Sequence, residues 1–219
     1  GYYVNNITVD HNDILDAPYT GISMGWGWGE NVPYAAYNRM TNNKIENVLY
    51  RLKDGAHIYT LDPMKGSVIS GNHLIKSSEW KGGIYHDNGS AYIKSTKNVI
   101  EDVPKWYKLT YFNIHDNVAY ENYSERPFVV TYPEINSVEP AIGKTNGEWP
   151  EAAKQIIANA GLQKDYKYLL ENYKKKENLR NATLENQNAQ RYPGLFVMAG
   201  DYLDGGEGVG FHDFFGETY

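Results

Sequence analysis

The sequence contains no cysteine. A disulfide framework and a thiol nucleophile are therefore excluded, while the cellular compartment stays open. Long apolar runs are also missing, because no stretch approaches the roughly 18–20 residues that a membrane-spanning helix needs. No signal peptide is visible, since Gly1–Asn6 lead directly into the patterned region that follows. We expect no association with a membrane.

Positive charge is scarce as well. The 21 Lys and Arg residues are outnumbered by 27 Asp and Glu residues, which gives a net charge of −6 over 219 residues. No basic stripe offsets this balance, so nucleic acid is not an expected partner. No Asp-rich cation site is visible locally either, and we expect neither a metal nor another cofactor.

A recurring asparagine is the main positive signal. It is followed by one variable residue and then usually by an aliphatic residue, and it comes after a short alternating apolar run. The intervals between successive Asn residues run from 19 to 35. The pattern occurs at Asn12–Ile14, Asn47–Leu49, Asn72–Leu74, Asn98–Ile100 and, more weakly, Asn117–Ala119.

A short strand every twenty to thirty residues, without helical connections, is typical of a stacked β-solenoid. Asn side chains at equivalent positions of stacked strands can form a hydrogen-bonded ladder. Three segments also align as the same strand on successive coils: Gly21–Met24, His57–Leu61 and Gly83–Asp87. The sequence therefore predicts an all-β fold, a parallel β-helix that ends in a short helical pair.

Four regions follow from the pattern. We expect β-helix coils over residues 1–125, which start without a capping segment and are therefore predicted to be the C-terminal part of a longer β-helix. Residues 126–176 are predicted to form an extended linker and two capping helices, one of which opens at Trp149-Pro150 and ends at Gly161. Residues 177–194 form a predicted linker, and residues 195–219 are too short to fold alone. The missing N-terminal part of the same β-helix is an expected partner.

Two segments on neighbouring coils carry a carboxylate, a His and a Tyr within a few residues: Lys53–Leu61 and Gly83–Ser90. In the aligned strands His57, Tyr59, Tyr85 and Asp87 share parity, so their side chains should project from one face. Adjacent strands lie about 4.8 Å apart, which would bring these groups together. Asp54-Gly55 and Asn88-Gly89 are also ordinary turn dipeptides, and this alternative stays open. His57 and His86 are candidate ligand contacts, and solvated or structural roles stay open for both.

The segment Gly25–Glu30 places Trp26 and Trp28 between three glycines. Glycine offers no packing neighbours, so exposed aromatic planes that stack on sugar rings are one interpretation. The alternative is that one Trp is buried against its own coil, since Trp is mostly buried in proteins.

Together, Asp54–Thr60, Tyr85–Ser90 and Gly25–Gly29 resemble motifs of the right-handed parallel β-helix glycoside hydrolases related to family 141. The resemblance covers about residues 1–175 and implies a glycosidase acting on a plant- or host-type polysaccharide or oligosaccharide. Residues 196–213 are similar to the start of a family 6 carbohydrate-binding module, of which only a fragment is present. The chain departs from the family pattern at Ala56-His57, and at Asn88 where Glu is common.

On this resemblance Asp87 and Asp54 are the predicted catalytic pair. Trp26, Trp28, Glu30, His57, Tyr59, Tyr85 and His86 are the predicted substrate contacts. Glycoside hydrolysis uses two carboxyl groups about 5–9.5 Å apart, whereas seven extended residues would separate Asp54 and Asp87 by about 23 Å. Only a sharp corner at Asp54-Gly55 or a shifted register would bring them together.

Two other functions remain alternatives. A polysaccharide lyase also suits a β-helix, as does a non-catalytic carbohydrate-binding β-helix. The acidic, Cys-free, Asn- and Tyr-rich composition is typical of a secreted, cell-surface or periplasmic bacterial protein.

Overall fold

The computed structural model describes residues 4–27, 35–77, 82–110, 112–126 and 135–175. The chain divides into two compact units, residues 1–170 and residues 171–219. In the second unit the described residues, 171–175, are helical. Trp28, Glu30, the predicted linker 177–194 and the predicted module fragment 195–219 lie outside the described residues. No helix in the described part of the chain is long and apolar enough to cross a membrane.

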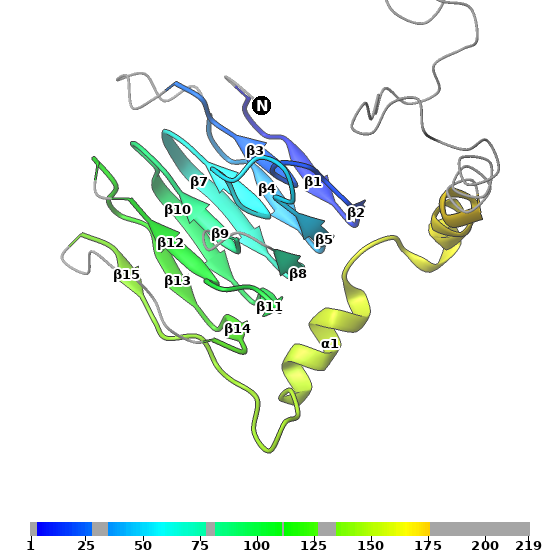
Figure 1. Cartoon of the computed structure of the whole chain (residues 1–219). Helices are drawn as coiled ribbons and strands as arrows, with labels where there is room; N and C mark the ends of the chain where they lie inside the picture. Colours follow the sequence, from blue (N-terminus) through cyan, green and yellow to red (C-terminus); the bar gives the residue numbers. More distant parts are fainter. Residues whose placement is uncertain (1–3, 28–34, 78–81, 111, 127–134, 176–219) are drawn as a thin grey trace, which may run out of the picture. The chain divides into compact units, whose positions relative to one another are not determined.

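Short strands recur in threes along the first unit, and each member of a triplet joins a different parallel sheet (Figure 1). The six-stranded sheet contains, in spatial order, β1 (Thr8–Asp10), β4 (Arg39–Thr41), β7 (Pro63–Ser70), β10 (Ala91–Thr96), β13 (Val118–Tyr120) and β15 (Ser137–Val138). The five-stranded sheet contains β14 (Tyr123–Ser124), β11 (Val99–Glu101), β8 (His73–Ser77), β5 (Lys44–Val48) and β2 (Asp13–Leu15). The four-stranded sheet contains β12 (Tyr107–Leu109), β9 (Ile84–His86), β6 (Ile58–Thr60) and β3 (Ile22–Met24).

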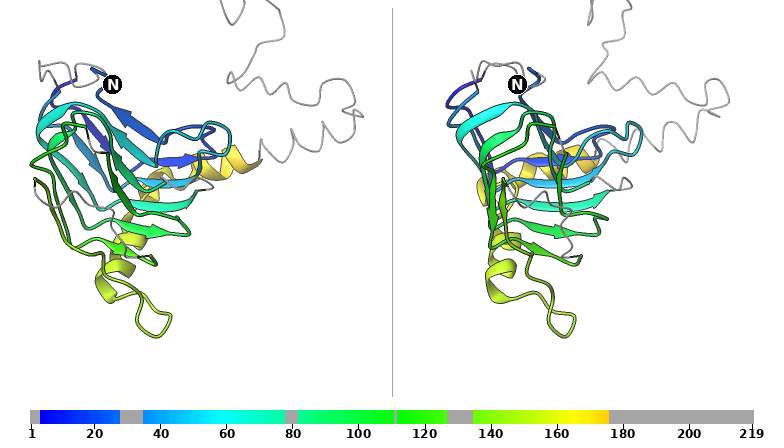
Figure 2. Two further views of the ribbon diagram at one scale, coloured as in Figure 1. Left: turned by 60° about the vertical axis from the view of Figure 1, so that its left-hand side comes forward. Right: turned by 90° about the vertical axis from the view of Figure 1, so that its left-hand side faces the viewer.

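The two turned views show these strands stacked coil upon coil (Figure 2). The three segments that were predicted to be the same strand on successive coils do share a register. Ile22 pairs with Ile58, and Ile58 pairs with Ile84. These three isoleucines are buried in the main hydrophobic cluster inside the coils. The predicted parallel β-helix is confirmed, and alternation along each strand decides which residues face its interior.

An asparagine ladder connects the coils at the turn between the six-stranded and five-stranded sheets. Each side-chain amide donates to the Oδ1 of the next Asn, at 2.8 to 3.0 Å. Each Oδ1 also accepts the backbone N–H of the Asn on the preceding coil. The ladder consists of Asn12, Asn43, Asn72, Asn98 and Asn122.

The sequence pattern placed two of these rungs wrongly. Asn47 lies at the far end of β5, where its amide donates to Asp16 at 2.5 Å. Asn117 lies just before β13 and donates to Asn136, in a separate row of the six-stranded sheet. Both coils carry a second Asn close by, Asn43 and Asn122, and only the backbone register selects between them.

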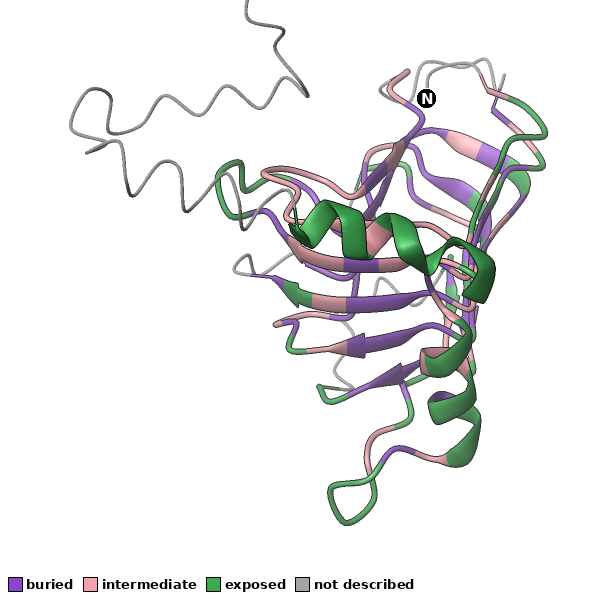
Figure 3. Ribbon diagram, turned by 90° about the vertical axis from the view of Figure 1, so that its right-hand side faces the viewer, coloured by how far each residue is buried: buried purple, intermediate pink, exposed green. Residues whose placement is uncertain are grey.

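Helix α1 (Glu151–Asn159) lies along the side of the coils, with much of its surface exposed (Figure 3). Its start is fixed by Trp149, which packs with Ala153, Val99 and Tyr123 in a second hydrophobic cluster. Beyond its end, the Gly161 N–H donates to the Asn42 carbonyl at 2.8 Å. The segment from Trp149 to Gly161 therefore spans several coils lengthwise, whereas the sequence predicted a cap over an open end. The 3₁₀ turn η1 (Lys164–Tyr166) and helical residues 167–175 follow.

Candidate functional site

The outer face of the four-stranded sheet carries a row of polar and aromatic side chains. Ser23 pairs with Tyr59, Tyr59 with Tyr85, and Tyr85 with Lys108, so one residue from each strand lies at the same level. Their neighbours along the strands, such as Ile58 and Ile84, point into the core. Alternation thus turns these four side chains away from the coil interior, although Tyr59 and Tyr85 are themselves almost completely covered, with 2% and 3% exposed.

Tyr59 and Asp87 are hydrogen bonded in this row. The Tyr59 hydroxyl donates to Asp87 Oδ2 at 2.6 Å, across two neighbouring coils. Asp87 directly follows β9, and its own N–H donates to the Thr60 carbonyl at 2.9 Å. Only 7% of Asp87 is exposed, so the carboxylate depends on protein donors more than on water. Asp87 is the most firmly positioned of the predicted catalytic residues.

The Tyr85 ring packs beside that of Tyr59, next to this carboxylate, and the two rings together are called the tyrosine floor. The Tyr85 ring centroid lies 5.2 Å from that of Tyr59, and Lys108 Nζ lies 4.6 Å from the Tyr85 ring centre on the other side. Burial raises the pKa of Tyr59, and its hydrogen bond to Asp87 raises that pKa further. Burial also raises the pKa of Tyr85, with further contributions from the charges of Asp87 and Asp54. Both phenols therefore keep their protons over the physiological pH range and can act as donors.

Asp54 lies at a corner of the chain that turns towards the same floor. The corner is closely packed, because a Cβ on Gly55 would lie 2.3 Å from Thr20 Oγ1. Tyr19 fixes the corner by donating its hydroxyl to the Asp54 carbonyl at 2.6 Å. Burial raises the pKa of Tyr19, and the charges of Asp54 and Asp87 add to this rise.

The two carboxylates therefore act on the same tyrosines, Tyr19 and Tyr85. The chain bends at Asp54, so the straight strand assumed for the separation of about 23 Å is interrupted there. Asp54 itself is exposed, in contrast to the nearly buried Asp87. The two groups differ in their environments, as the two carboxyl groups of a glycosidase do.

Trp26 borders the row at the edge formed by β3. Its ring meets Tyr59 edge-on at 5.8 Å between centroids, and its Nε1–H donates to Ser23 Oγ at 2.6 Å. Its backbone φ of 99° is rare for a bulky residue. Gly25 beside it has a φ of 104° and approaches the Leu61 backbone so closely that no Cβ would fit. Such backbone conformations cluster at ligand-binding sites.

Asp62 was not predicted from the sequence. Its N–H donates to the Asn88 carbonyl at 3.2 Å, and its carboxylate accepts the backbone N–H of Gly27. Asp62 thus joins the Trp26 segment to the turn that follows Asp87. In the sequence, Leu61-Asp62-Pro63 resembles an ordinary turn and gives no further sign of this position.

His57 and His86 do not face the site, although the sequence offered both as substrate contacts. Both are completely buried. The His57 ring lies against the backbone carbonyls of Gly82 and Ile75, and burial lowers its pKa. His86 points into the coil interior, where Nδ1 lies 2.6 Å from Thr60 Oγ1, and burial lowers its pKa to about 3. Both imidazoles are neutral structural groups.

The remaining predicted contacts, Trp28 and Glu30, lie outside the described residues. Among the residues that the structure describes, no group of three or more His, Cys, Asp or Glu side chains could hold a metal ion.

No protein-family model matches this chain, and no curated protein is significantly similar to it. One solved structure that the chain resembles is described as "Glycoside hydrolase". The two are 26% identical, and the match covers 75% of this chain and 24% of that one, with a TM-score of 0.47. The chain thus spans about a quarter of the protein to which it is similar.

Proposed function

We propose that this chain forms part of a glycosidase whose reaction takes place on the outer face of the four-stranded sheet. The observation that carries this proposal is the pairing of a nearly buried, phenol-bonded carboxylate, Asp87, with an exposed carboxylate, Asp54, around one tyrosine floor. Hydrolysis of a glycosidic bond needs two carboxyl groups in different roles.

The roles follow from the two environments. Tyr59 keeps its proton and donates to Asp87, so it holds that carboxylate in one orientation, as a nucleophile or base requires. Asp54 is open to solvent and supplies the second carboxyl group that the reaction needs.

Trp26 provides the sugar-binding surface, and Tyr59, which is only 2% exposed, packs against its ring. Flat aromatic rings contact the C–H faces of sugars, and the half-buried Trp26 lies beside the Tyr59–Asp87 pair. We propose a plant- or host-type polysaccharide or oligosaccharide as the substrate, and a secreted or cell-surface location for an enzyme that acts on it.

The test is to replace Asp87 by Asn and, separately, Asp54 by Asn, and to measure release of reducing sugar from polysaccharides. Each variant should lose about 10²–10⁴-fold in turnover, the usual contribution of an acid or base group. Asp116→Asn, at an exposed Asp that bonds to His115 and not to the Tyr59–Asp87 pair, is the matched control and should keep full activity.

Unchanged turnover of Asp87→Asn would reject the assignment. Products that absorb as unsaturated uronates would indicate a lyase instead, and sugar binding without any turnover would indicate a binding β-helix.

A further inference from the structure

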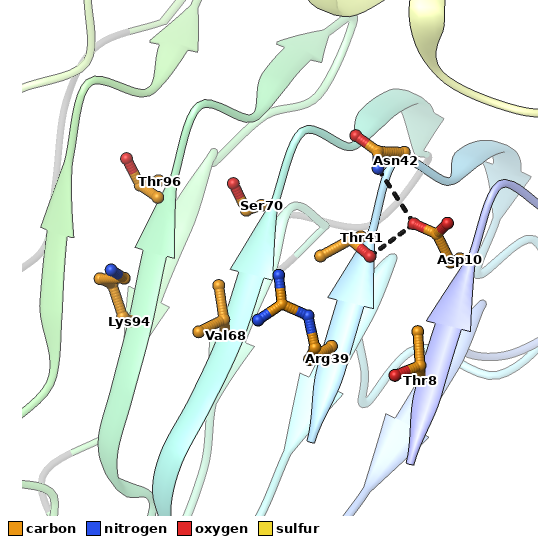
Figure 4. Close-up of a pocket in the computed structure, with 9 residues that line it drawn as sticks. All are labelled: Thr8, Asp10, Arg39, Thr41, Asn42, Val68, Ser70, Lys94 and Thr96. Atoms are coloured by element: carbon orange, nitrogen blue, oxygen red, sulfur yellow. Dashed lines mark hydrogen bonds between the residues drawn. The ribbon is translucent and has the colours of Figure 1, made fainter. Parts of the chain in front are cut away.

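A hollow lies on a different sheet from the tyrosine site. It is an open depression of about 460 Å³ on the outer face of the six-stranded sheet (Figure 4). Its floor is built from β1, β4, β7 and β10, so that it crosses four coils. Nothing in the proposed reaction uses this face.

One row of residues across the hollow has an apolar residue in the middle and one cationic residue on each side of it. Arg39 pairs with Val68, and Val68 pairs with Lys94, so the two cationic residues lie two strands apart. At about 4.8 Å per strand, their Cα atoms are about 10 Å apart. Within the described parts of the chain, neither Arg39 nor Lys94 forms an ion pair. Both charges are available to a ligand.

The next row consists of hydroxyl groups at the same levels: Thr41, Ser70 and Thr96. The single carboxylate of the hollow, Asp10, is already engaged, since it accepts from Thr41 Oγ1 at 2.6 Å and from Asn42 Nδ2 at 3.0 Å (Figure 4). It therefore offers little repulsion to an incoming anion.

Thr96 gives independent support for a ligand. Only 6% of this residue is exposed, yet its Oγ1 has no hydrogen-bond partner although it lines the hollow. A buried hydroxyl without a partner costs free energy that a ligand oxygen can recover.

We propose that this hollow binds a segment of an acidic polysaccharide. The ligand lies across the strands, places successive carboxylate or sulfate groups on Arg39 and Lys94, rests a sugar ring on Val68, and bonds its hydroxyls to Ser70 and Thr96. Arg forms paired hydrogen bonds with such anions, and Lys binds them as a point charge. The net charge of −6 opposes an extended nucleic acid backbone, whereas short anionic repeats need only these two cations.

The test compares the wild-type chain with Arg39→Gln/Lys94→Gln and with Thr96→Val. Affinity is measured by titration calorimetry with polygalacturonate, which carries carboxylates, with dextran sulfate, and with neutral dextran. Lys154→Gln on α1 removes an equal charge from a residue outside the hollow and is the matched control.

We expect wild type and Lys154→Gln to bind one of the acidic polymers, and the preferred polymer identifies the anion. The double variant should bind it about 10–100-fold more weakly, as the loss of two charge-assisted contacts implies, and Thr96→Val a few-fold more weakly. Binding should also weaken as salt is raised.

The proposal is overturned if the double variant binds as tightly as wild type, if neutral dextran binds equally well, if neither acidic polymer binds, or if single-stranded DNA binds more tightly than both. Asp87→Asn should bind like wild type, so loss of the hydrolytic reaction and loss of this site are separate results. Circular dichroism confirms that each variant is folded.

Discussion

At the scale of single residues, the site depends on a carboxylate that is almost completely shielded from solvent. Asp87 is 7% exposed and accepts the Tyr59 hydroxyl. A carboxylate in such surroundings loses hydration, and protein donors must replace it. Tyr59 can do so because its raised pKa keeps the phenol protonated.

A double-mutant cycle of Tyr59→Phe and Asp87→Asn measures this pairing. Tyr59→Phe alone should destabilise the fold by about 1–3 kcal/mol, because it leaves the Asp87 carboxylate short of a donor. With Asp87→Asn already present, the same change should cost less, with a coupling of about 0.5–3 kcal/mol in urea unfolding.

The control is the pair Tyr59→Phe and Asp116→Asn, whose side chains share no hydrogen bond, and it should be additive within about 0.5 kcal/mol. Additivity of Tyr59→Phe with Asp87→Asn would show that the hydrogen bond contributes nothing to the site.

At the scale of elements, the asparagine ladder fixes the register of the coils. Asn72 is completely buried, and its amide donates both to Asn98 Oδ1 and to the Met40 carbonyl. Its Oδ1 also accepts from Asn43. One side chain thus bonds groups on both adjacent coils, which keeps the strands that carry Tyr59 and Tyr85 at matching levels.

Asn72→Ala should therefore destabilise the protein by about 2–4 kcal/mol, because several buried polar groups lose their partners together. Asn12→Ala, at the end of the ladder and partly exposed, should cost about 1 kcal/mol or less, since water replaces the lost contacts. Chemical unfolding of both variants tests this gradient, and equal losses would contradict it.

The period-2 pattern was sufficient to predict the strands and the outward row. It placed Tyr59 and Tyr85 on one face because alternation fixes parity once the coils are aligned. It did not predict that His57 is covered, because burial of an outward residue depends on neighbouring backbone, here the carbonyls of Ile75 and Gly82. His86 has the opposite parity to Tyr85, and alternation alone would have placed it inside.

The sequence pattern also could not predict the bend at Asp54 or which asparagines form the ladder, because both depend on how the coils pack. The estimated separation of Asp54 and Asp87 assumes an extended chain. The bend at Asp54 interrupts that chain, and the packing of Gly55 against Thr20, which accompanies the bend, is not visible in the sequence pattern. Likewise, Asn43 and Asn47 both fit a simple spacing rule, and the pairing of β5 with β2 and β8 selects Asn43.

At the scale of the whole molecule, the coil interior holds ionisable groups in their neutral state. Burial lowers the pKa of His86 to about 3 and also lowers the pKa of His57. In the unfolded chain both imidazoles titrate near 6.5. Between the folded and unfolded values the unfolded chain binds more protons, so acid favours unfolding.

The free energy of unfolding should therefore change little between about pH 7 and pH 9, below the ionisation of tyrosine, and should fall as the pH drops below about 6.5. His86 alone should contribute a loss of about 2 kcal/mol between pH 6.5 and pH 5, at about 1.4 kcal/mol per unit. Urea unfolding at several pH values measures this slope. His86→Gln should flatten it by about one proton even if that variant is less stable throughout. A slope that survives in His86→Gln would mean that this imidazole is protonated inside the coils, contrary to its burial.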